Sequence, residues 1–298
     1  MSTTMNATAA ATPAPDAAST KQANTLQASN IQRVQALVRE FQNGNPAGYL
    51  AGVADDVKGS MLGGLIPGAE NITNKAEFIA VFDKLADYME VKKFEPTNWR
   101  AVNDDVLFSV EWEFVYKPTG VTHETTALVR KVVKDGMICE KYHMCDVEAI
   151  TGKPTPHDTS SVTTVQALLA EFQAGRPEGY MAGVADDVKA DMLGGLIPGA
   201  EAISNKEQFF GVMGQMDQYM QVQKFAPRDF RALPNGDMMF LVDWQFTWLA
   251  TGKAVETTAV VRKVVKDGKI CEKYHMCDVE AVLAPSTSPR DVIAAGEA

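Results

Sequence analysis

The side chains best suited to chemistry lie in a ten-residue block that occurs twice. EKYHMCDVEA occupies residues 140–149 and again residues 272–281. Alternate residues of a strand share one face, so Tyr142 lies with Asp146, and Tyr274 lies with Asp278. A carboxyl group in an apolar cavity can move a proton next to a carbonyl, and a tyrosine hydroxyl can orient the carbonyl oxygen. These four residues are the candidate catalytic groups. The alternative is an aspartate at the strand end that caps the chain or faces water.

The opposite face of the same strand carries Cys139, Lys141, His143 and Cys145. A closed metal site needs four converging ligands. We therefore expect no metal here and predict a packing surface that joins the two copies. Cys139 and Cys145 would lie ~20 Å apart along a strand, which is too far for a disulfide, so we expect free thiols.

The repeat covers almost the whole chain. GVADDVK stands at residues 52–58 and 183–189, an offset of 131, whereas the block above is offset by 132. One residue is therefore gained in the second copy, near residues 234–237. Each copy has the size of an ordinary domain. We expect domains at 31–150 and 162–283, a linker at 151–161, a disordered tail at 1–30 and a flexible tail at 284–298.

Composition restricts the partners. The net charge of −10 argues against nucleic acid and anionic membranes. No apolar run approaches the ~18 residues of a membrane span. The Ala-, Thr- and Ser-rich N-terminus lacks the apolar core of a secretory signal, so a cytoplasmic location is expected, with an organelle as the alternative.

The elements that position the block are two helices, an apolar glycine-rich segment at 61–68 that suits a short strand or a loop, a third helix, and then long antiparallel strands. Val34, Leu37, Val38 and Phe41 recur with helical spacing, and Pro46 opens a second short helix. Asn74 and Glu77 have the spacing of a capping box that opens a third helix, and Asn205 and Gln208 repeat it. After Met89 the apolar period changes to two, and Asp135-Gly136 marks a hairpin. Separate runs of helices and strands indicate an α+β fold.

These motifs resemble the SnoaL-like branch of the nuclear-transport-factor-2-like superfamily, which also holds ketosteroid isomerases and polyketide cyclases. The resemblance rests on FQNG at 41–44, ADDV at 54–57, KDGMI at 134–138 and the closing strand that ends in Asp146. It implies two tandem cones, each a curved antiparallel sheet wrapped around a long helix with two further N-terminal helices. It also implies that Asp146 and Asp278 act as general acid and base.

The resemblance further implies a pocket at the open end of each cone. With the Tyr142 face inside, the expected lining residues are Trp112, Trp244, Tyr116, Trp248, Met144, Met276, Tyr49 and Tyr180. A steroid-isomerase base would fall at residues 58–65, where the first copy has no carboxylate and the second has only Asp191.

The expected function is binding of an apolar small molecule in each cone. Catalysis as a cofactor-independent cyclase or isomerase is one alternative, and non-catalytic binding or assembly is another. The two domains are expected to pair through their sheets, or the chain to form a homodimer.

Overall fold

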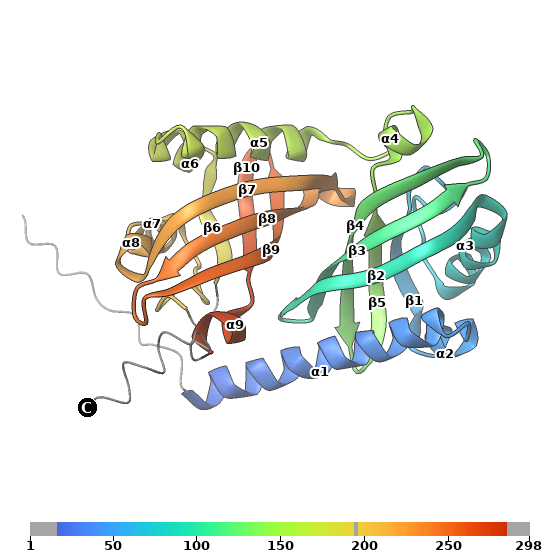
Figure 1. The fold of residues 1–298 in the computed structure, drawn as a ribbon, viewed down its shortest axis with the longest axis horizontal. Helices are drawn as coiled ribbons and strands as arrows, with labels where there is room; N and C mark the ends of the chain where they lie inside the picture. Colours follow the sequence, from blue (N-terminus) through green and yellow to red (C-terminus); the bar gives the residue numbers. More distant parts are fainter. Residues whose placement is uncertain (1–16, 194–195, 285–298) are drawn as a thin grey trace, which may run out of the picture.

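The computed structural model describes residues 17–193 and 196–284 and contains two domains of the same design (Figure 1). The α+β class and the tandem arrangement are confirmed. The first domain contains α1 (Ala17–Gln42), α2 (Pro46–Leu50), β1 (Val53–Met61), α3 (Lys75–Tyr88), β2 (Met89–Val102), β3 (Asp105–Tyr116), β4 (Val121–Lys134), β5 (Met137–Met144) and α4 (Val147–Thr151).

The second domain repeats this order with one interruption. It contains α5 (Ser160–Gln173), α6 (Pro177–Ala182), β6 (Val184–Met192), α7 (Lys206–Met213), α8 (Met216–Tyr219), β7 (Met220–Ala232), a 3₁₀ turn (Pro234–Gly236), β8 (Asp237–Trp248), β9 (Lys253–Lys266), β10 (Lys269–Met276) and α9 (Val279–Leu283). The 3₁₀ turn lies where the second copy gains its extra residue.

Each domain has one five-stranded sheet. The strand orders are β1-β5-β4-β3-β2 and β6-β10-β9-β8-β7. Neighbouring strands are antiparallel except at one edge, where β1 is parallel to β5 and β6 is parallel to β10. After β1 the chain passes through α3 to the opposite edge of the sheet, where it enters β2. The antiparallel strands β3, β4 and β5 then follow in order, so β5 lies beside β1 and runs in the same direction. The helices then close the concave face of the sheet.

Local sequence signals explain several boundaries. The Asn74 side chain accepts a hydrogen bond from the Glu77 amide at 3.0 Å, and Glu77 accepts one from the Thr73 amide at 2.8 Å. This capping box satisfies amides that the first helical turn leaves free. Asp135 and Gly136 both have positive φ, of 51° and 73°, as a two-residue type I′ hairpin requires.

The domain boundaries differ in part from those expected. Helix α1 begins at Ala17, so residues 17–30 are helical rather than part of a disordered tail. Helix α5 begins at Ser160, and α4 extends to Thr151. Residues 1–16 and 285–298 lie outside the described residues, and the predictions for them stay open.

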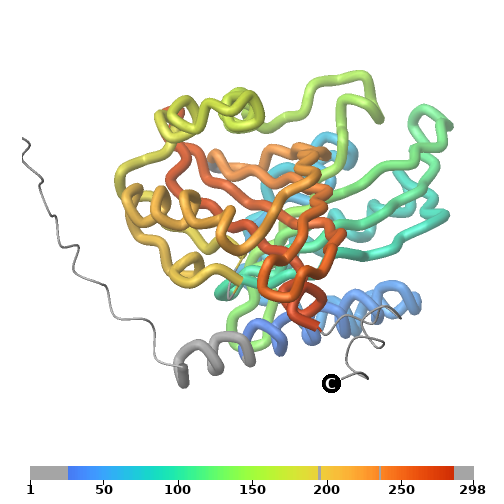
Figure 2. The backbone as a smooth tube through the Cα atoms, turned by 60° about the vertical axis from the view of Figure 1, so that its left-hand side comes forward, coloured from blue at the N-terminus to red at the C-terminus, as the bar shows by residue number. Residues whose placement is uncertain are grey.

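The convex faces of the two sheets pack against each other in the middle of the molecule (Figures 1 and 2). This interdomain core consists of Val102, Leu107, Leu128, Met144, Leu233, Met239, Leu241, Val260 and Met276, with Tyr142 and Tyr274 packed against it. The expectation that the Cys-His-Cys face joins the copies is wrong, because the opposite face of β5 and β10 does so.

A β-bulge explains this reversal. Ile138 pairs with Val133 and Glu140 pairs with Val132, so Cys139 is an extra residue in β5. An inserted residue moves every later side chain to the other face of the sheet. Ile138 therefore lies in the domain core, whereas Tyr142, four residues later, lies at the interdomain core.

Among the described helices, none combines the length and apolar character that a bilayer span requires.

Candidate functional site

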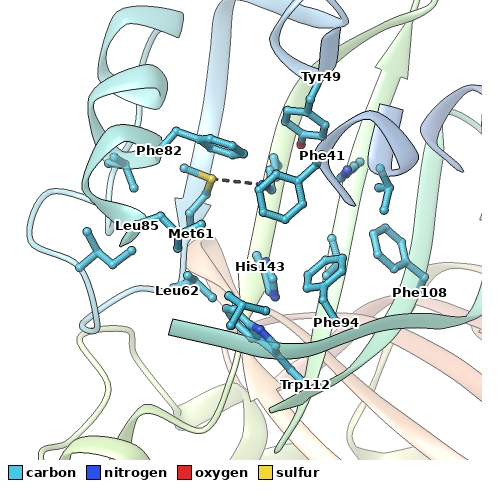
Figure 3. A pocket seen from close by; sticks show the side chains of 17 residues that line it. Phe41, Tyr49, Met61, Leu62, Phe82, Leu85, Phe94, Phe108, Trp112 and His143 are labelled. Carbon is cyan, nitrogen blue, oxygen red and sulfur yellow. Dashed lines mark hydrogen bonds between the residues drawn. The ribbon is translucent and has the colours of Figure 1, made fainter. Parts of the chain in front are cut away.

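Each domain encloses an aromatic cavity between its helices and the concave face of its sheet. Figure 3 shows the cavity of the first domain. In the first domain the wall is built from α1, α2, α3 and all five strands. Its aromatic members are Phe41, Tyr49, Phe82, Phe94, Phe108 and Trp112. The predicted lining positions Tyr49, Trp112, Tyr180 and Trp244 do line the cavities.

Two lysines lie at the inner end of the first cavity. Lys131 on β4 and Lys141 on β5 are directly paired across the strands, and both side chains point into the domain. Their Nζ atoms lie 4.9 and 5.2 Å from the centre of the Tyr49 ring. Lys141 Nζ donates to the Met61 sulfur at 3.2 Å, a weak acceptor. Lys131 is only 2% exposed.

The second domain contains the same pair. Lys263 on β9 faces Lys273 on β10, and both are buried. Lys263 Nζ lies 3.3 Å from the Tyr180 hydroxyl. Lys273 Nζ lies 5.0 Å from the centre of the Phe209 ring. The two cones therefore share one inner constellation of two lysines and a tyrosine.

No carboxylate among the described residues forms an ion pair with any of these four lysines. Burial lowers the pKa of Lys141 to about 7 and that of Lys273 to about 8. Burial, and then the neighbouring lysine, hold the pKa of Lys131 and of Lys263 well below the usual range. Desolvation penalises the ammonium form, so Lys131 and Lys263 are the neutral amines at pH 7, Lys141 is about half neutral there, and Lys273 becomes mostly neutral above about pH 8.

Each cavity also contains polar atoms that have no partner among the described residues. His143 stacks on Trp112 at 5.0 Å between ring centres. The Tyr49 hydroxyl, the Trp112 indole nitrogen and His143 Nε2 are buried and form no hydrogen bond with any described residue. Burial, followed by the charges of Lys141 and Lys131, holds the pKa of His143 well below its usual range. Unpaired buried donors cost about 1–3 kcal/mol each, so a ligand that accepts their hydrogen bonds gains this free energy.

The two cavities differ in size. The free volume is about 50 Å³ in the first cone and about 150 Å³ in the second. Phe82 of the first wall is replaced by Met213 in the second. Helix α7 ends at Met213, and Gly214 and Gln215 separate it from α8, whereas α3 is continuous. Glycine disfavours a helix interior, and the interrupted helix leaves the second cone roomier.

The predicted catalytic residues lie outside both cavities. Asp146 is the N-cap of α4, where it accepts a hydrogen bond from the Ala149 amide at 3.0 Å. Its other carboxylate oxygen lies 3.9 Å from Arg231 of the second domain. Asp278 caps α9 in the same way, through the Ala281 amide at 2.9 Å. The geometry therefore supports the alternative stated above, in which each aspartate caps the chain at the end of its strand.

The predicted tyrosine partners are also displaced from the cavities. Tyr142 and Tyr274 pack at the interdomain core under Arg130 and Arg262, each 5.4 Å from the ring centre. Burial raises the pKa of both tyrosines to about 12.

The remaining expected lining residues lie elsewhere as well. Met144 and Met276 belong to the interdomain core. Tyr116 donates to the Leu65 carbonyl at 3.2 Å in the core, and Trp248 stacks on Tyr219.

Asp191, the carboxylate at the position of a steroid-isomerase base, does not line the second cavity, and its counterpart Ser60 does not line the first. Ser60 lies 3.2 Å from Nε2 of His157. Its counterpart Asp191 is mostly buried, and burial together with Glu201 raises its pKa to about 7.

The cysteines are free, as expected, and Cys145 and Cys277 are buried. No cluster of three or more His, Cys, Asp and Glu side chains occurs in the described part of the chain.

The Asp146 and Asp278 caps lead to a prediction about stability. Asp146→Ala with Asp278→Ala should lower the free energy of unfolding by about 1 kcal/mol per helix, because alanine cannot accept the amide hydrogen bond. Asp146→Asn with Asp278→Asn should cost far less, because asparagine is an equally good cap. Urea denaturation measures both. An Asn variant as unstable as the Ala variant would show that the carboxylate charge matters more than the cap.

Comparison with known proteins finds one family match, in the first domain. Residues 34–141 match the model of the SnoaL-like domain. No curated protein matches the chain. An NTF2-like protein from Burkholderia thailandensis E264 is 20% identical, with a TM-score of 0.38, and the match covers 42% of this chain and 98% of that one.

Two further structures are similar over one domain's length. A candidate SnoaL-like polyketide cyclase from Mesorhizobium loti is 18% identical, with a TM-score of 0.34 and coverage of 39% and 97%. TerC, co-crystallised with polyporic acid, is 17% identical, with a TM-score of 0.36 and coverage of 42% and 99%.

Proposed function

We propose that this protein binds a compact apolar molecule with an oxygen acceptor, chiefly in the second cone. Residues 34–141 match the SnoaL-like domain, and the second repeat has the same strand order. One observation carries the proposal. Buried lysines line both aromatic cavities, Lys131 and Lys141 in the first and Lys273 in the second, and no carboxylate of the described residues forms an ion pair with them. Ligand pockets typically combine such apolar walls with a few convergent polar groups.

The cavity size indicates the size of the ligand. A dry cavity of about 150 Å³ is large enough for benzene, and the second cone offers about this volume. A single ring would contact Phe225 and Trp244 on the wall, and its oxygen would accept hydrogen bonds from Lys273 and its neighbours. The first cone, with about 50 Å³, needs Phe82 to move before it admits a ring.

The hypothesis of proton transfer by aspartate receives no support from the geometry, because Asp146 and Asp278 cap helices outside the cones. If the protein is a cyclase or isomerase, its base is a cone lysine. A neutral lysine amine can accept a proton next to a carbonyl in the same way as a carboxylate. The alternative is an assembly domain whose cones are filled by side chains. The first cone, with a cavity of only about 50 Å³, agrees with it best.

The test uses benzoate, which has an acceptor, and toluene, which has none. Both should bind the full chain and quench the fluorescence of Trp244, which lines the second cone. Lys273→Met should weaken benzoate about tenfold or more, the loss of about 1.4 kcal/mol expected for a charge-assisted hydrogen bond, and leave toluene nearly unchanged. Lys141→Met is the matched control, because it alters the first cone alone.

A filling substitution completes the test. Met213→Phe restores the residue that narrows the first cone, so it should abolish binding of both compounds. The proposal fails if neither compound binds the wild-type chain, or if benzoate binding is the same in the wild type, Lys273→Met and Met213→Phe.

A further inference from the structure

The inner end of each cone is built like a site for covalent capture of a carbonyl. Resting on the proposed ligand site, we propose that Lys273 is a nucleophile that forms an imine with a compact aldehyde or ketone in the second cone, and that Lys141 is its counterpart in the first. Three features of the structure support this assignment: access, cross-strand pairing, and a nearby proton donor.

The first feature is access from the cavity. Lys273 lines the second cavity together with His275 and Trp244. Its surroundings are aromatic, with Nζ 5.0 Å from the Phe209 ring centre and 5.7 Å from the Tyr180 ring centre. A ligand seated against Trp244 can therefore bring its carbonyl carbon to an amine that is sheltered from bulk water. Lysines desolvated in this way act as nucleophiles toward carbonyls.

The second feature is the pairing of two lysines on adjacent strands. Lys263 and Lys273 are directly opposite each other in the β9–β10 ladder, and Lys131 and Lys141 are opposite in β4–β5. Opposed side chains on one face lie ~5 Å apart at Cβ, and two like charges there repel. The repulsion lowers the pKa of Lys263 and of Lys131, so these two amines stay neutral and can take up the proton that the attacking amine of Lys273 or Lys141 releases.

The third feature is a proton relay beside the pair. Lys263 Nζ lies 3.3 Å from the Tyr180 hydroxyl. When the Lys273 amine attacks, the C–N bond forms, the carbonyl π pair moves to oxygen, and the nitrogen passes one proton through Lys263 and Tyr180 to that oxygen, which gives a neutral carbinolamine. A proton from the Lys263–Tyr180 pair then lets the hydroxyl leave as water, and the nitrogen returns its second proton to the same pair. One amine and one carbonyl give one imine and one water, with no oxidant or reductant.

Reductive trapping tests the proposal on the full chain. Benzaldehyde with sodium cyanoborohydride converts an imine into a stable benzyl amine, which intact mass and peptide mapping detect. At pH 7, Lys273 should be benzylated roughly a hundredfold faster than the exposed Lys189, because the aromatic cavity holds the aldehyde against Lys273 and burial lowers the pKa of Lys273 to about 8. Benzoate should protect Lys273 and leave Lys189 unprotected, a control that needs no variant.

The outcomes separate the two proposals. Binding of benzoate with no excess label on Lys273 overturns the imine and leaves the binding function intact. Label on Lys263 in place of Lys273 overturns the assignment of the nucleophile. If neither benzoate nor toluene binds, the proposed function itself fails. Met213→Phe should abolish the excess label on Lys273, because the larger side chain fills the cavity while both lysines are retained.

Discussion

The free energy of unfolding is expected to rise by about 3 kcal/mol or more between pH 7 and pH 9. A lysine that is neutral in the folded protein and charged in the unfolded chain adds about 1.4 kcal/mol of stability per pH unit. Lys141, with a pKa of about 7, satisfies this condition over nearly the whole interval, and Lys273, with a pKa of about 8, satisfies it over the upper half. Lys131 and Lys263, with pKa values lower still, act in the same direction.

The sign follows from proton uptake. As the pH falls from about 10.5 toward 7, the unfolded chain binds protons that the folded cones do not, so stability is lost. Below the folded pKa both states are protonated and the loss is complete. The upper limit of pH 9 is set by Cys145 and Cys277, whose pKa burial raises to about 12, because their ionisation favours the unfolded chain at higher pH.

Methionine variants isolate the lysine contribution. Lys141→Met with Lys273→Met should be more stable than the wild type at pH 7, because methionine fits a cavity wall without the cost of a buried amine. The rise between pH 7 and pH 9 should become smaller in that variant. Lys134→Met with Lys266→Met is the matched control, since both residues are exposed at strand ends. An unchanged pH profile in the cone variant would contradict neutral buried amines.

The second large effect is expected at the junction of the domains. Arg262 Nη2 lies 2.7 Å from Asp237 within its own domain, and Nη1 lies 3.4 Å from Asp105 of the first domain. Arg130 makes the symmetric contacts, 3.0 Å to Asp105 and 3.8 Å to Asp237. These side chains are no more than 12% exposed. Four charges of alternating sign therefore lie at the centre of the interdomain core.

Arg262→Met should lower the free energy of unfolding by about 3–5 kcal/mol, because it leaves Asp237 buried without its main partner. Arg176→Met is the control. Arg176 lies 2.7 Å from Glu171 but is exposed, so its loss should cost no more than about 1 kcal/mol. Guanidinium denaturation of both variants gives the comparison. Equal, small losses would mean that water enters the junction and replaces the arginine.

Much of the architecture follows from the sequence alone. The repeat predicts two domains, the apolar periods predict the helices and the long strands that follow them, and the two capping boxes and the Asp135-Gly136 turn fall where expected. These signals are local, because a cap or a type I′ turn is specified by residues within one turn of each other. The aromatic residues Tyr49 and Trp112 were likewise predictable as cavity wall, because their strand and helix patterns are not interrupted.

The site required the tertiary structure. The alternation along β5 predicts that Tyr142 and Asp146 face the cone, but the extra residue Cys139 reverses the faces. A bulge depends on how two strands align, so no pattern within one strand reveals it. Lys131 and Lys141 lie ten residues apart in the sequence, and only the β4–β5 pairing makes them neighbours. Lysine in a strand ordinarily indicates a solvent-facing position, and here the closed cone buries it.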